Sequence, residues 1–119
     1  MNFKSDLPIY IQIINLIKKN IVSGKIKGGE KLASVRELST ELKVNPNTIQ
    51  RSYQELERED LVFTQRGMGT FVTKDEKIIK ELKRSMASNM VKSFVKDMKS
   101  MGFEKEEIIE LIKDGVGEE

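Results

Sequence analysis

Two helix starts lie close together in the middle of the chain, and they constrain its fold more than any other feature. Ser34 is a favoured N-cap residue, and Glu37 follows three positions later with the spacing of a capping box. Asn45 followed by Pro46 has the pattern of a second N-cap with proline at the first helical position. The sequence therefore predicts two short helices joined by a tight turn. Their expected apolar positions are Val35, Leu38 and Leu42 in the first helix and Ile49, Tyr53 and Leu56 in the second.

The periodicity changes after the second helix, which is expected to end near Glu59 and Asp60. Residues 61–64 and 70–73 are rich in β-branched and aromatic side chains, and Gly67 and Gly69 lie between them. This pattern predicts a β-hairpin with a loop of more than two residues. A helix-turn-helix followed by a hairpin is typical of a winged helix-turn-helix.

Helical spacing is present on both sides of this region. Pro8 suits the first turn of an upstream helix, and Gly24 is a plausible end for it. Gly28 and Gly29 indicate a turn before the helix-turn-helix. The apolar stripe of the upstream helix comprises Tyr10, Ile13, Ile14, Ile17 and Ile21.

Downstream of residue 75, a long helix is expected to end at Gly102, and a short helix from Glu104 to Lys113 to end at Gly115. The apolar stripe of the long helix comprises Ile79, Leu82, Met86, Met90, Phe94, Met98 and Met101. We therefore expect a mainly α fold with a small β-hairpin. Residues 1–74 are predicted to form an N-terminal winged helix-turn-helix DNA-binding domain, and residues 75–119 a C-terminal two-helix dimerisation tail.

The composition narrows the function classes. The chain has 119 residues with no His and no Cys, which excludes zinc fingers, thiol catalysis and His-based acid–base chemistry. It shows no phosphate-binding glycine loop and no convergent pair of acids, so we expect no enzymatic activity, no cofactor and no metal. The apolar stretch from Leu7 to Ile17 is too short to span a bilayer. We expect a cytoplasmic protein without a membrane partner.

The charge is divided unevenly along the chain. Residues 1–74 contain 12 Lys and Arg and 8 Asp and Glu, a net charge of +4, whereas residues 75–119 contain 9 and 11, a net charge of −2. A basic first part favours contact with a polyanion. In a winged helix the start of the second helix lies in the major groove, where Asn, Gln and Arg side chains recognise base edges.

Candidate DNA-binding residues follow from this geometry. Ser34 and Arg36 are expected to contact phosphate, and Arg66 at the wing tip to contact the minor groove or phosphate. Asn45 is a cap in the first place, with a phosphate contact as its second role. The predicted set is Ser34, Arg36, Asn45, Asn47, Thr48, Gln50, Arg51 and Arg66, with Gly67 beside Arg66 letting the backbone approach DNA closely.

Residues 8–73 resemble the GntR family of bacterial transcription regulators. The resemblance rests on the segments Pro8–Ile13, Ser34–Leu38, Val44–Thr48, Tyr53–Glu57 and Arg66–Val72. The Asn-Pro-Asn-Thr version is similar to the YtrA-type short subfamily. The resemblance implies a homodimeric regulator of a type commonly encoded beside ABC-type transporter genes. Because a symmetric dimer presents two recognition helices, we expect it to act as a repressor on an inverted-repeat operator. Many family members carry glycine where this chain has Asp60.

Two helices alone bury too little apolar surface to be stable, so we expect the tail to pair with a second copy. The predicted dimer interface comprises Ile79, Leu82, Met86, Met90, Phe94 and Met98. The residues leave open whether a small-molecule effector binds, for example in an apolar pocket at this interface. The alternative function is a winged-helix module for protein–protein contact without specific DNA recognition.

Overall fold

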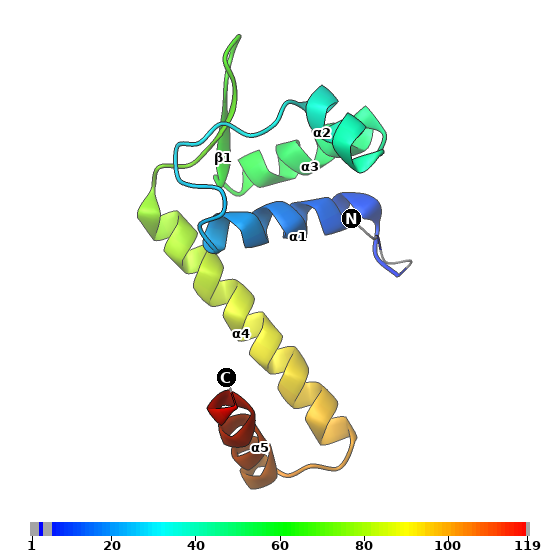
Figure 1. The fold of residues 1–119 in the computed structure, drawn as a ribbon, viewed down its shortest axis with the longest axis vertical. Helices are drawn as coiled ribbons and strands as arrows, with labels where there is room; N and C mark the ends of the chain where they lie inside the picture. Colours follow the sequence, from blue (N-terminus) through cyan, green and yellow to red (C-terminus); the bar gives the residue numbers. More distant parts are fainter. Residues whose placement is uncertain (1–2, 4–5, 119) are drawn as a thin grey trace. The chain divides into compact units, whose positions relative to one another are not determined.

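The computed structural model describes residue 3 and residues 6–118. In this part of the chain it contains five helices and one two-stranded antiparallel sheet (Figure 1), which confirms the predicted fold class. The elements are α1 (Ile9–Val22), α2 (Val35–Leu42), α3 (Pro46–Arg58), β1 (Val62–Gln65), β2 (Gly69–Val72), α4 (Glu76–Ser100) and α5 (Lys105–Gly117).

The chain forms two compact units, one reaching to Lys83 and the other beginning at Arg84. The first unit includes the winged helix and the first turns of α4, because Ile78, Ile79 and Leu82 pack against the same core as α1 and α3. It therefore extends nine residues beyond residue 74, where the sequence pattern placed the end of the winged helix.

Hydrogen bonds at the starts of α2 and α3 have the predicted form. The Ser34 Oγ accepts the backbone N–H of Glu37 at 3.0 Å, and the Glu37 carboxylate accepts the N–H of Ser34 at 2.9 Å. The hydrogen bond from the Ser34 N–H, together with the Ser34 side chain, favours the ionised carboxylate and lowers the pKa of Glu37. The Asn45 Oδ1 accepts the N–H of Asn47 at 2.8 Å, and Pro46 is the first residue of α3. The two helix starts are therefore fixed by local chemistry.

The core of the first unit lies between α1 and α3, which run side by side in Figure 1. Ile13, Ile49 and Leu56 are completely buried. Burial of such side chains contributes roughly 1.5–3 kcal/mol each. The core residues are Ile13, Ile14, Ile17, Ile21, Leu32, Ile49, Tyr53, Leu56, Leu61, Val62 and Val72.

The hairpin of β1 and β2 forms the wing, with Val62 opposite Val72 and Gln65 opposite Gly69. The rings of Phe63 and Phe71 stack at a centroid distance of 5.7 Å. A third segment, residues 29–32, also lines β2. The N–H of Val72 donates to the Glu30 carbonyl at 2.9 Å, and the N–H of Leu32 donates to the Thr70 carbonyl at 2.8 Å. The sequence indicated only a turn near this position.

Two helix ends differ from expectation. Pro8 is the N-cap of α1 rather than part of its first turn, since its backbone is extended and its carbonyl accepts the N–H groups of Ile11 and Gln12. Helix α5 continues past Gly115 to Gly117. Gly115 does not have the positive φ with which a glycine ends a helix, so the expected end at this residue was wrong.

Ionisation of Tyr53 lowers the stability of the fold at alkaline pH. The residue is buried, and its hydroxyl donates to the Ala33 carbonyl at 2.6 Å. Burial, reinforced by the carboxylates of Glu37 and Glu41, raises the pKa of Tyr53 to about 12. An unfolded tyrosine titrates near pH 10. The stabilisation from the neutral phenol is therefore complete below pH 10 and is lost as the pH rises from about 10 to about 12.

We expect Tyr53→Phe to reduce the free energy of unfolding by about 1 kcal/mol at pH 7, because it removes one hydrogen bond. It should also make unfolding less sensitive to pH between about 10 and 12. Urea titrations at pH 7 and pH 11, followed by circular dichroism, measure both effects. Equal losses of stability in wild type and variant at high pH would contradict this assignment.

Asp60 has a left-handed backbone with φ of 62°, which a residue with a Cβ adopts at an energetic cost. We expect Asp60→Gly to raise the free energy of unfolding by up to about 1 kcal/mol. Asp75→Gly is the control with the same change of charge. Its carboxylate accepts the N–H of Lys77 at 2.9 Å at the start of α4, so its loss should lower stability. Thermal unfolding of both variants tests whether Asp60→Gly raises the stability and Asp75→Gly lowers it.

Candidate nucleic-acid interface

The start of α2 presents a hydroxyl and a guanidinium group at the surface. Ser34 and Arg36 are both exposed. The Ser34 oxygen accepts the N–H of Glu37, and the Ser34 side chain also interacts with the Glu37 carboxylate. An exposed hydroxyl and an exposed cation at a helix N-terminus can hold a phosphate group.

Helix α3 presents a row of amide and guanidinium groups. Asn47, Gln50 and Arg51 are exposed, while Thr48 is half-buried. Gln54 is exposed as well, and helical spacing places it on the same face, three and four residues after Arg51 and Gln50. Gln54 is not in the set predicted from the sequence, although its spacing of four residues from Gln50 places it on the same helix face.

Asn45 has a different role from the rest of this group. Its side-chain oxygen accepts the N–H of Asn47, as the N-cap of α3. This leaves only its amide N–H₂ for an external acceptor. Side chains with both donor and acceptor groups exposed therefore lie further along α3.

The wing tip is a loop of three residues, Arg66 to Met68, between β1 and β2. Gly67 has φ of 78°, and no atom lies within 4 Å of the position that its Cβ would occupy. Arg66 and Met68 are exposed. The backbone at this tip can therefore approach another molecule closely, with a guanidinium group beside it.

Lys31 adds a cation to the wing. The hairpin pattern alone did not predict this position. Lys31 forms an isolated bridge with Phe71, and its side chain crosses Gly69. A Cβ at Gly69 would lie 2.6 Å from the Lys31 Cε and 3.5 Å from its Nζ. The glycine leaves the space through which the lysine reaches the outer part of the wing.

The three candidate arginines, Arg36, Arg51 and Arg66, form no ion pair with the residues that the structure describes. Among the described residues, ion pairs join Lys18 to Glu59 and Arg58 to Glu55, and neither pair includes Arg36, Arg51 or Arg66. The Arg51 guanidinium instead lies over the ring of Tyr10, with its Cζ 3.6 Å from the ring centroid. Free cations on an exposed surface are suited to bind phosphate or a base edge.

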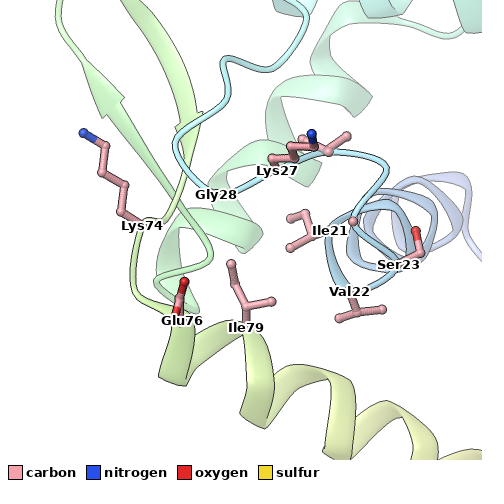
Figure 2. Close-up of a pocket in the computed structure, with 10 residues that line it drawn as sticks. Ile21, Val22, Ser23, Lys27, Gly28, Lys74, Glu76 and Ile79 are labelled. Atoms are coloured by element: carbon pink, nitrogen blue, oxygen red, sulfur yellow. The ribbon is translucent and has the colours of Figure 1, made fainter.

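Two hollows lie in the first unit. One, of about 370 Å³, is lined by Ile9, Tyr10, Asn47, Thr48 and Arg51 and belongs to the candidate interface. The other, of about 430 Å³, lies where α1 ends and α4 begins; Figure 2 shows Ile21 and Ile79 within it and Lys27, Lys74 and Glu76 around it. No candidate DNA-contact residue lines the second hollow, so it is separate from the interface.

No helix in the described part of the chain is both long enough and apolar enough to cross a membrane.

Comparisons with known proteins identify the family. Residues 9–72 match the model of the bacterial regulatory proteins, gntR family. The chain is 47% identical to the uncharacterized HTH-type transcriptional regulator YhcF of Bacillus subtilis, over 93% of this chain and 92% of that protein. It is 41% identical to the HTH-type transcriptional repressor YtrA of the same organism, over 93% of this chain and 86% of that protein.

Solved structures agree with this assignment. A GntR family transcriptional regulator from Listeria monocytogenes has a TM-score of 0.89 and 43% identity, covering 94% of this chain and 98% of that one. AraR(DBD) in complex with operator ORR3 has a TM-score of 0.56 and 30% identity, covering 61% of this chain and 88% of that one. The chain thus belongs to the GntR family, and the protein is a DNA-binding transcriptional regulator with YtrA-type relatives.

Proposed function

We propose that the protein is a homodimeric repressor that binds an inverted-repeat operator. The observation that carries the proposal is the set of exposed polar side chains at the starts of α2 and α3 and at the wing tip, where Arg36, Arg51 and Arg66 form no ion pair with any described residue. In a winged helix these three places meet DNA. Their chemistry matches the task, because amides and guanidinium groups recognise base edges and cations bind phosphate.

Each segment has its own part in the proposed complex. The start of α3 lies in the major groove, where Asn47, Gln50 and Arg51 contact base edges and Thr48 contacts the backbone or a base. Ser34 and Arg36 bind phosphate, with Asn45 as a further contact. Arg66 and Gly67 meet the minor groove or the adjacent phosphates. Base contacts provide the sequence preference, and phosphate contacts fix the orientation of the protein.

The repressor role is supported by the similarity to YtrA, which is itself described as a transcriptional repressor. A dimer bound across a promoter would block access of the polymerase. The YtrA-type resemblance extends the proposal to the target, since regulators of this type are commonly encoded beside ABC-type transporter genes. We infer that such genes are controlled by this protein.

The second unit supports a dimer because it leaves most of its apolar surface uncovered. Ile108 is its one buried apolar residue among those described, at 3% exposure, whereas Met90 is 71% exposed. A helical pair of this size does not bury enough surface to be stable alone. Its other large exposed apolar side chains are Val91, Met101, Ile109, Leu111, Ile112 and Val116.

The proposed interface lies within this unit. Ile79 and Leu82 pack against the core of the first unit in their own chain, so they are less available to a partner. Met86, Met90, Phe94 and Met98 belong to the second unit; Met90 is exposed and the other three are half-buried. A second copy is the simplest cover for this surface, and a two-fold dimer matches the symmetry of an inverted repeat.

Selection of bound sequences from a random duplex library, at near-physiological salt, tests the proposed function. We expect recovery of an inverted repeat, because a symmetric dimer presents two copies of α3 to the DNA. Recovery of a single unrepeated site would contradict the dimeric mode. No enrichment at all would contradict specific DNA recognition and favour a protein–protein contact.

Two substitutions on α3 test whether Arg51 contacts a base of the selected duplex. Arg51→Ala is expected to weaken binding to the selected duplex by about 1–3 kcal/mol and to relax the preference at one base pair. Arg58→Ala removes the same side chain near the other end of α3, where Arg58 pairs with Glu55. It should leave affinity and preference unchanged. Equal effects of the two variants would exclude a base contact by Arg51.

Met90→Asp tests the dimer. Because Met90 is exposed within its own chain, a carboxylate there should not disturb the fold, but it would be buried in the proposed interface. We expect the variant to sediment as a monomer and to lose binding to the repeated site. Ser88→Asp is the control, since it introduces the same charge on a different face of α4, four residues before Lys92. A Met90→Asp variant that stays dimeric would contradict this interface.

A further inference from the structure

We propose that Tyr10 is a positioning residue for DNA recognition, because its ring holds the Arg51 guanidinium in place for its base contact. This proposal rests on the proposed function, in which Arg51 contacts a base. It concerns a residue of α1, a helix outside the helix-turn-helix and the wing. The structural basis is a chain of contacts from the core through Tyr10 to Arg51.

The backbone of Tyr10 is anchored to α3. The Ser52 Oγ, completely buried, lies 3.0 Å from the carbonyl oxygen of Tyr10 and 3.0 Å from that of Thr48. The side chain of Tyr10 is half-buried and packs against the core. The position of the ring is therefore fixed relative to the helix that carries Arg51.

Arg51 lies on this fixed ring. Its Cζ is 3.6 Å from the ring centroid, well within the range of a cation–π contact. Such a contact uses the face of the ring and no N–H donor, so the five N–H groups of the guanidinium remain available to DNA. A bidentate contact to guanine needs two of these donors.

The contact matters because Arg51 is otherwise unrestrained. It is exposed, and no carboxylate pairs with it among the described residues. A free arginine side chain loses rotamer entropy when it is ordered at an interface. The ring orders it before binding, beside the hollow that Asn47 and Thr48 also line. Tyr10 thereby lowers the entropic cost of the Arg51 contact.

A double-mutant cycle on the selected duplex tests the proposal. The proteins are wild type, Tyr10→Leu, Arg51→Ala and the double variant, with Tyr10→Phe as the conservative control. We expect Tyr10→Leu to weaken binding about two- to five-fold, the range of an exposed cation–π contact. Tyr10→Phe should bind within about two-fold of wild type, because the ring face is retained. In the Arg51→Ala background, Tyr10→Leu should have no further effect.

The preference for the correct base pair gives a readout that a general loss of stability would not change. Each protein is also measured on a duplex with the Arg51-dependent base pair altered. Tyr10→Leu should lose affinity for the selected duplex and not for the altered one. Equal losses on both duplexes, or additive losses in the cycle, would overturn the proposal.

Other outcomes distinguish a failure of the positioning role of Tyr10 from a failure of the proposed function. If Tyr10→Leu binds more tightly than wild type, the ring competes with DNA for Arg51, and the positioning role is wrong. If Tyr10→Phe loses as much as Tyr10→Leu, the hydroxyl acts instead of the ring, which also overturns the proposal. If Arg51→Ala binds like wild type while wild type still selects a repeat, the proposed function stands without Arg51 and the role of Tyr10 fails with it.

A measurement on the unmodified protein keeps the test independent of the folding of any variant. Protons that lie over an aromatic face are shifted upfield in the NMR spectrum. We expect such a shift for the side-chain protons of Arg51 in wild type, and its retention in Tyr10→Phe. Ordinary shifts for these protons in the wild-type protein would overturn the proposal.

Discussion

The buried face of α3 is the constraint on which the rest of the DNA-binding unit depends. It contacts each of the segments that surround it. Tyr53 donates to the Ala33 carbonyl just before α2, and Ser52 contacts the Tyr10 carbonyl in α1. At the other end, the Leu61 N–H donates to the Leu56 carbonyl where the chain leaves α3 for the wing. A shift of α3 would therefore move the start of α2 and the wing together, which keeps the proposed DNA contacts in a constant relation.

Much of this unit was predictable because its signals are local. A capping box requires only Ser34 and Glu37, and an N-cap followed by proline requires only Asn45 and Pro46. The apolar positions of α1 and α3 were predictable for the same reason, since helical spacing alone selects the buried face. The family resemblance then agreed with what these local patterns predicted.

The contacts that the sequence did not reveal join residues far apart in the chain. Residues 29–32 became a third segment beside β2 only because the core brings Leu32 against the wing. Likewise, neither Tyr10 nor Arg51 carries a local signal of their contact, which depends on the packing of α1 against α3. At Gly115 the local signal was present but misleading, because this glycine does not adopt the positive φ with which glycine commonly ends a helix.

The surface polar residues of α2 and α3 have two separate roles: some cap the helix starts, and others are exposed to a binding partner. Ser34 and Asn45 fix where α2 and α3 begin, and their side-chain oxygens are engaged within the chain. Further along α3, the polar side chains of Asn47, Gln50, Arg51 and Gln54 are exposed. Because capping is strictly local, the exposed positions can change without disturbing the helix start. A winged helix built this way can alter which bases it recognises while its fold, held by the opposite face of α3, stays the same.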